Sequence, residues 1–170
     1  MLDLLHIENI AVIETADIRF RQGFNALTGE TGAGKSIVID AMGAVLGGRT
    51  SRELIRTGAD RAFVSACFSG VPADLPGLSE CGVSPDENGE LLLQREIYED
   101  GKNTCRANGR PVTVAQLRRM GAELLNIHGQ HDGAALLDEE RHGAYLDRFG
   151  RTDGPLNAYR EAYGVLWDLD

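Results

Sequence analysis

The sequence predicts an α/β fold in which a glycine-rich phosphate-binding loop joins a short strand to a buried helix, beside an antiparallel β-meander. Three observations lead to this prediction. Residues 29–36 match the pattern G-x-x-x-x-G-K-[ST] without a mismatch. Residues 37–46 are apolar on nearly all sides, as expected of a helix buried against a sheet. Two strand-like runs within residues 90–107 flank Asp100-Gly101, which is a strong hairpin turn signal.

The composition favours one domain with one sizeable core, because the chain has 170 residues and is 42% hydrophobic. Its three cysteines (Cys67, Cys81 and Cys105) form no C-x-x-C pair, which suits a reducing cytosol. No apolar run approaches the roughly 18 residues of a membrane span, and the N-terminus lacks the basic region of a signal peptide. We therefore expect a cytoplasmic protein without membrane partners. The net charge of −9 argues against a surface that binds nucleic acid all over, but leaves a local patch open.

The first half of the chain reads as strands around one helix. Residues 2–10 and 12–20 contain apolar–polar alternation and predict a hairpin. Residues 23–28 are short and bounded by turns, so we expect a strand that leads into the phosphate loop. Residues 62–68 are apolar and also predict a strand. Prolines and glycines in residues 69–89 indicate a surface excursion.

The second half begins with the meander and continues through a capped helix. Asn108-Gly109 predicts a second tight turn. Thr113 is a typical helix cap, and Gln116 stands at the third position after it, as in a capping box. Residues 123–127 predict a buried strand.

The last part of the chain has helical periodicity. Residues 134–149 fit an amphipathic helix, and residues 151–155 interrupt it. A heptad seam then follows at Leu156, Tyr159, Tyr163 and Leu166. This seam favours a helix at residues 165–168. The less favoured alternative is a Walker-B strand, which is an apolar strand that ends in an aspartate. Two heptads are too few to establish a coiled coil from the pattern alone.

The phosphate loop carries the clearest chemistry. Its glycines let backbone N–H groups approach phosphate oxygens. Lys35 supplies a charge for the β- and γ-phosphates, and the Ser36 hydroxyl is a suitable ligand for Mg²⁺. We therefore predict ATP and Mg²⁺ as cofactors, with a chance glycine-rich turn as the alternative. The predicted nucleotide-binding residues are Gly29, Glu30, Thr31, Gly32, Ala33, Gly34, Lys35, Ser36 and Ile37.

A polar loop at residues 128–132 is the second candidate site. Its Gln130 can place an amide oxygen on Mg²⁺ or on an attacking water without adding charge. His128 and His131, with Asp132, are an alternative metal site, but no further His or Cys cluster completes it. A third interpretation is that this segment is an ordinary polar loop tip.

Three arginines follow the predicted central helix at spacings of three and four: Arg49, Arg52 and Arg56. They share one face if the segment is helical. That face is either a solvated basic surface or a contact for nucleotide phosphate or DNA backbone, and Arg49 is the preferred candidate.

A hydrolytic phosphate-loop enzyme also needs a carboxylate near its Mg²⁺. No apolar strand ending in Asp or Asp-Glu follows the loop in this sequence. We therefore expect part of the active site to lie elsewhere.

Residues 5–10, residues 23–25 and the early phosphate loop resemble the N-terminal half of the ATPase head in the SMC-like branch of the ABC ATPases. Within that branch, residues 29–37, 106–109 and 127–131 are similar to a bacterial DNA-repair group. The resemblance covers essentially the whole chain. It implies that Gln130 occupies the Q-loop position, so that Lys35 and Gln130 are the catalytic residues and Ser36 and Gln130 the metal ligands.

The resemblance also implies a split head, in which a long coiled coil separates this half from the signature motif, Walker B and the catalytic glutamate. Residues 1–150 are then the N-terminal lobe and residues 151–170 the start of a coiled-coil helix. The implied partners are the C-terminal half, a second head in a homodimer, and DNA.

In that family ATP hydrolysis drives head engagement in double-strand break repair and recombination, at the nucleoid. The chain alone is expected to have little ATPase activity. Two alternatives stay open: a phosphate-loop small-molecule kinase, and a module that binds ATP without hydrolysing it.

Overall fold

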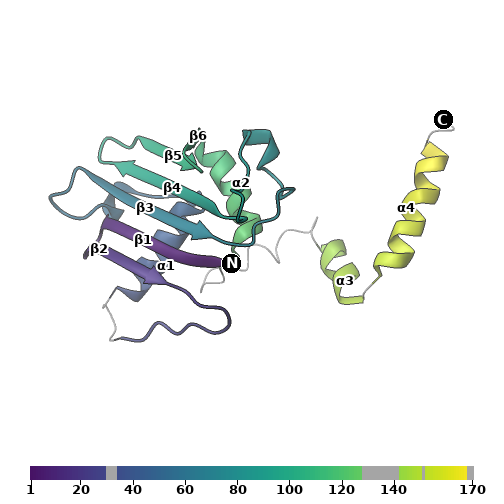
Figure 1. Cartoon of the computed structure of the whole chain (residues 1–170), viewed down its shortest axis with the longest axis horizontal. Coiled ribbons are helices and arrows are strands. Elements are labelled where there is room, and N and C mark those ends of the chain that lie inside the picture. Colours follow the sequence, from purple (N-terminus) through teal and green to yellow (C-terminus); the bar gives the residue numbers. More distant parts are fainter. Residues whose placement is uncertain (30–33, 128–141, 151, 168–170) are drawn as a thin grey trace. The chain divides into compact units, whose positions relative to one another are not determined.

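The computed structural model describes residues 1–29, 34–127, 142–150 and 152–167 (Figure 1). The chain divides into two compact units, Met1–Ile127 and His128–Asp170. Within the described residues, none of the helices combines the length and apolar character that crossing a membrane requires.

The first unit is built on a six-stranded sheet in which every neighbouring pair is antiparallel. The strand order is β2-β1-β3-β4-β5-β6 (Figure 1). The predicted hairpin and meander are confirmed. The strands are β1 (Leu2–Ile10), β2 (Ile13–Arg19), β3 (Arg61–Phe68), β4 (Leu91–Tyr98), β5 (Asn103–Ala107) and β6 (Arg110–Val112).

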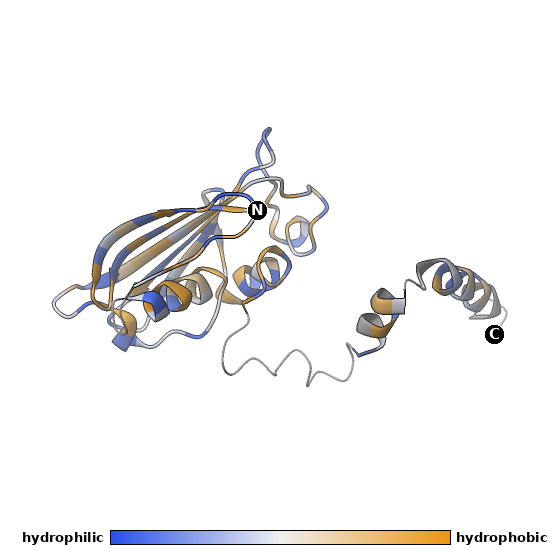
Figure 2. Cartoon of the chain, turned by 90° about the horizontal axis from the view of Figure 1, so that it is seen from below, coloured by the Kyte–Doolittle hydropathy of each residue, from blue (hydrophilic) through white to orange (hydrophobic). Residues whose placement is uncertain are grey.

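Two helices cover one face of this sheet (Figure 2). Helix α1 (Lys35–Val45) packs on β1, β3 and β4, and α2 (Val114–Leu124) packs on β5. Strands β3 and β4 alternate between buried and more accessible side chains, so one side of each enters the core beneath the helices. Short 3₁₀ turns, η1 (Arg52–Leu54) and η2 (Ser79–Cys81), lie in the connections.

Helix α1 ends where α2 approaches it very closely. Gly47 has φ +82°, and a Cβ added there would lie 2.4 Å from the backbone nitrogen of Arg118 in α2. A Cβ on Gly121 would lie 2.7 Å from the carbonyl oxygen of Leu46. Both positions therefore need glycine, and the C-terminal end of α1 is fixed against α2.

The capping box predicted for α2 is confirmed. The hydroxyl of Thr113 accepts a hydrogen bond from the backbone N–H of Gln116 at 3.2 Å. The Gln116 side chain in turn accepts one from the backbone N–H of Thr113 at 2.8 Å. Two donors that a helix start would otherwise leave unpaired are satisfied.

Two predicted strands are wrong. The predicted strand at residues 23–28 has no regular secondary structure. Of the one predicted at residues 123–127, Glu123 and Leu124 belong to α2 and residues 125–127 follow it as coil. A strand exists through hydrogen bonds to a neighbour, and within the described residues neither segment has a neighbouring strand. The capped helix α2 instead continues through Leu124 to the end of its amphipathic pattern.

The second unit contains helices α3 (His142–Gly150) and α4 (Asp153–Trp167). Helix α4 confirms the helical prediction for the heptad segment, although its pairing with another helix stays a prediction. The rings of Tyr159 and Tyr163 stack with centroids 5.9 Å apart, as side chains four residues apart on a helix can. Helix α3 covers the end of the predicted amphipathic segment, whose residues 134–141 lie outside the described part.

Candidate functional site

The start of α1 is built to receive an anion. Gly34 is the N-cap, with φ 91° and ψ 1°, a left-handed conformation that favours glycine. The first N–H groups of a helix have no acceptor within the helix and carry partial positive charge. Among the described residues, no side chain caps this end and no acidic residue stands in the first turn. The helix end therefore offers its N–H groups to a negatively charged ligand.

Lys35 links the two described ends of the phosphate loop. Its ammonium group donates a hydrogen bond to the carbonyl oxygen of Gly29. The next residue, Ser36, is exposed, whereas Ile37 packs against the core. Packing of Ile37 against the core thus fixes the start of the helix, which carries the Lys35 ammonium group and the Ser36 hydroxyl. Glu30, Thr31, Gly32 and Ala33 lie outside the described residues, so their roles stay predictions.

The turn between β1 and β2 lies beside this helix start. A Cβ placed on Gly34 would lie 3.9 Å from Cδ1 of Ile13, the first residue of β2. The same turn is joined to the last residue of η1 by a hydrogen bond from the N–H of Ala11 to Leu54 O at 2.8 Å. The guanidinium of Arg56 donates to Val12 O at 3.0 Å. Strand β1 and its turn are thus joined to Leu54 and Arg56, and Ile13 lies beside the start of α1.

The three arginines do not share a helical face. A shared face would require the whole segment to be helical, and only the η1 turn is helical there. Arg49 and Arg52 are exposed, while Arg56 is half-buried and bonded to Val12 O. The proposed role of Arg49 stays a prediction.

The second predicted site lies outside the described residues. It comprises Gln130 together with His128, His131 and Asp132. In the described ranges, no group of three or more His, Cys, Asp or Glu side chains is arranged to hold a metal ion. Both interpretations of this loop therefore stay predictions.

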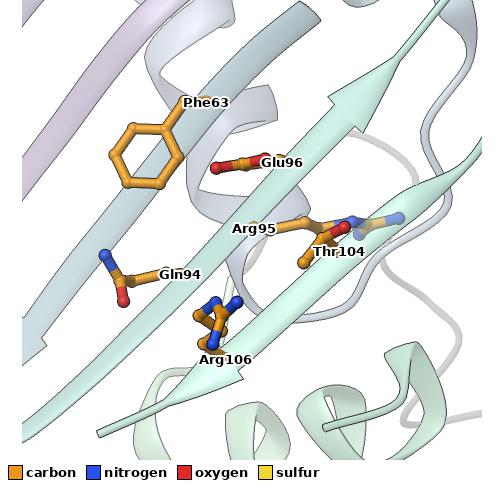
Figure 3. Close-up of a pocket in the computed structure, with 6 residues that line it drawn as sticks. All are labelled: Phe63, Gln94, Arg95, Glu96, Thr104 and Arg106. Carbon is orange, nitrogen blue, oxygen red and sulfur yellow. The ribbon is translucent and has the colours of Figure 1, made fainter. Parts of the chain in front are cut away.

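A pocket of about 270 Å³ lies on the sheet face opposite the helices (Figure 3). Its polar lining includes Glu96, which pairs with Arg61 at 3.4 Å. The sheet separates this pocket from α1, so it is not part of the phosphate site. The lining residues are Phe63, Gln94, Arg95, Glu96, Thr104 and Arg106, although the guanidinium of Arg95 lies on the helix side of the sheet.

The sequence interpretation missed one polar residue that contacts α1. Arg95 belongs to β4 and is only 3% exposed. Its signal in the sequence is a charged residue at an inward-facing position, between Leu93 and Ile97, in a strand whose other inward positions are apolar.

Comparison with known proteins identifies a family model and a curated relative with similar sequences. A family model described as an AAA domain matches residues 4–71. The DNA repair protein RecN of Bacillus subtilis is 42% identical over 168 residues, which cover 96% of this chain and 29% of that protein. The chain thus spans about three tenths of the length of this curated relative.

Two solved structures share the fold. A structure from work on ATP-driven dimerization and DNA-stimulated activation of SMC ATPases has a TM-score of 0.63 at 24% identity, covering 85% of this chain and 95% of that one. The SMC head domain from Thermotoga maritima has a TM-score of 0.54 at 26% identity, covering 69% of this chain and 40% of that one. The predicted fold class, an SMC- and ABC-type head with an antiparallel sheet, is confirmed.

Proposed function

We propose a function on the premise that this chain is a homologue of the RecN DNA repair proteins over nearly its whole length. It is the ATP-binding half of an SMC-like head. Together with a C-terminal half it hydrolyses ATP, and hydrolysis controls the engagement of two heads during DNA double-strand break repair and recombination.

The observation that carries this proposal is the start of α1. Gly34 holds a left-handed backbone, the helix N-terminus follows directly, and Lys35 lies against Gly29. A phosphate chain needs these three elements: close backbone approach, N–H donors and a cation. The residues present therefore fit a nucleoside triphosphate, and we assign Lys35 the role of neutralising charge on its terminal phosphates.

The exposed hydroxyl of Ser36 fits the role of a Mg²⁺ ligand, because Mg²⁺ prefers oxygen ligands and is commonly bound together with substrate phosphates. We assign Gln130 as the second group that senses the metal or the attacking water, on the strength of the family resemblance. Bound ATP with Mg²⁺ would supply the phosphoanhydride bond that is hydrolysed. The chain's own residues bind and orient this group.

We propose that the remaining catalytic groups lie in a C-terminal half like the part of the RecN relative that this chain does not span, since the chain spans 29% of that relative. ATP-driven dimerization is described for the related SMC ATPase. By analogy we propose a second head and DNA as partners, Arg49 as a contact to nucleotide or DNA, and α4 as the start of a coiled coil. The protein would act at the nucleoid in the cytoplasm.

Reconstitution of the head tests this proposal. The 170-residue chain alone is expected to show little ATP hydrolysis, and addition of the C-terminal half is expected to restore it. In the reconstituted head, Gln130→Ala should reduce hydrolysis more than nucleotide binding. Robust turnover by the chain alone that Lys35→Ala leaves unchanged would contradict the proposal, and an equal loss of binding and hydrolysis would make Gln130 structural.

A further inference from the structure

Arg95 places a positive charge inside the core of the first unit. It stands in β4 between the buried residues Leu93 and Ile97 and points to the same side of the sheet, beneath the helices. Burying a charged group costs free energy unless it is well compensated. A residue of this kind at an otherwise apolar position therefore calls for a specific set of partners.

The guanidinium of Arg95 donates hydrogen bonds to the C-terminal end of α1 and to neighbouring segments. Its Nη1 donates to Ala44 O at 2.8 Å and to Gly48 O at 2.7 Å. Its Nη2 donates to Thr50 Oγ1 at 3.1 Å, and its Nε donates to Asn103 Oδ1 on β5 at 2.9 Å. One side chain thus joins the sheet to the helix end and to the segment after it.

All four acceptors are neutral, so no carboxylate balances the charge of Arg95 in this set. The carbonyl groups at a helix C-terminus carry partial negative charge, which favours a cation there. Burial lowers the pKa of Arg95, but a guanidinium stays protonated in proteins. The charge is therefore compensated mainly by the end of α1.

A second arginine holds the same turn from α2. Arg118 Nε donates to Gly47 O at 2.9 Å. The turn after α1 is thus held on one side by β4 and on the other by α2. Because Gly47 and Gly121 already bring the two helices into close contact, α1 has little freedom to slide.

The opposite end of α1 carries the candidate phosphate site. The helix has 11 residues, which corresponds to a length of about 16 Å. A helix of this length moves as a rigid element, so a shift at Ala44 reaches Lys35 and Ser36. Fixing one end fixes the direction in which the other end presents its N–H groups.

We infer that Arg95 is a positioning residue for nucleotide binding, which sets the place of Lys35 and Ser36 by locking the far end of α1 to β4. This inference rests on the proposed function, because it assumes that ATP binds at the start of α1. The competing explanation is that Arg95 only stabilises the fold.

The ATP-dependent rise in melting temperature separates these two roles. A ligand that binds only the folded state stabilises it by an amount set by its concentration and its dissociation constant. A purely structural residue lowers the melting temperature with and without ATP alike, and leaves the ATP-dependent rise unchanged. A positioning residue reduces the rise itself.

The test uses the 170-residue chain with Mg²⁺ and ATP. Arg95→Lys keeps the charge but loses the planar fork that serves several acceptors at once. We expect it to weaken ATP binding about threefold to tenfold, which is in the lower part of the range for residues coupled through one network. Two controls should keep the wild-type rise: Val83→Ala, which removes buried volume far from α1 in sequence, and Arg106→Met, which removes a charge on the outer face of the sheet.

An unchanged rise in Arg95→Lys, while Lys35→Ala abolishes it, would overturn this inference and leave the proposed function standing. Absence of any rise in the wild-type chain would overturn both. Should Arg95→Lys fail to fold, Asn103→Ala decides, since it removes the Nε acceptor at an exposed position. A reduced rise in that variant supports the inference and a full one overturns it.

Discussion

The ammonium group of Lys35 donates a hydrogen bond to the carbonyl oxygen of Gly29, six residues earlier. This contact ties the first turn of α1 to the first residue of the glycine-rich motif. The lysine charge, the left-handed backbone at Gly34 and the helix N-terminus therefore lie within one short stretch. Each of them favours an anion, and their effects on a bound phosphate act in the same direction.

Ser36→Ala is expected to weaken ATP binding only when Mg²⁺ is present, because the hydroxyl acts through the metal. Titrations with ATP in Mg²⁺ and in excess EDTA measure this difference. The wild-type chain should bind more tightly in Mg²⁺, and the variant should lose most of that advantage. Ser79→Ala, an exposed serine in η2, is the control. An equal loss in both buffers would show that Ser36 does not act through Mg²⁺.

Gly47→Ala is expected to destabilise the chain more than Gly58→Ala. Both glycines have positive φ, +82° and +87°, so both substitutions carry the strain of a left-handed residue, about 1–2 kcal/mol. Only the Cβ at Gly47 meets the backbone of Arg118, which adds roughly 1–3 kcal/mol of overpacking. Urea unfolding measures both free energies. Equal losses would contradict the close approach of α1 and α2.

His6 is expected to make the stability of the chain depend on pH. Its Nδ1 lies 2.6 Å from Asp17 Oδ1 and its Nε2 lies 2.9 Å from Glu8 Oε1. Burial lowers the pKa of His6, but the hydrogen bonds to Asp17 and Glu8 outweigh it, so the pKa lies above 6.5. The protonated ring then stabilises the fold fully below about pH 6.5, and this contribution is lost as pH rises through the folded-state pKa.

Melting temperatures across that range provide the measurement. The wild-type chain should lose stability as pH rises from about 6 to about 8, and His6→Gln should flatten this dependence. Asp17→Asn, which removes the closer partner, should flatten it partly. A wild-type slope that His6→Gln leaves intact would assign the pH dependence to other groups.

Local signals predicted much of the sheet and its turns. A turn is present at Asp100-Gly101, and Gly101 takes a positive φ of +86°, which glycine adopts without steric cost. The cap at Thr113 and the partner Gln116 were also predicted correctly. Such features depend on residues a few positions apart, so the sequence alone contains the information.

Features that depend on distant partners were predicted less well. Residues 23–28 and 123–127 were predicted as strands from their local pattern, but a strand forms only beside another strand. Residues 49–58 have helical spacing of arginines, but Arg56 is held by Val12, more than 40 residues earlier. The contacts of Arg95 with the end of α1 likewise join residues about 50 positions apart, which no local pattern reports.

Direct measurement of ATP binding by the 170-residue chain tests the central claim, that the start of α1 is a nucleotide site. In Mg²⁺, calorimetric titration should give one site per chain for the wild type and for Lys102→Ala, whose side chain is 81% exposed. Lys35→Ala should bind about 10- to 100-fold more weakly, the loss expected for a hydrogen bond from a charged group. No ATP binding by a folded wild-type chain, or equal binding by Lys35→Ala, would contradict the claim.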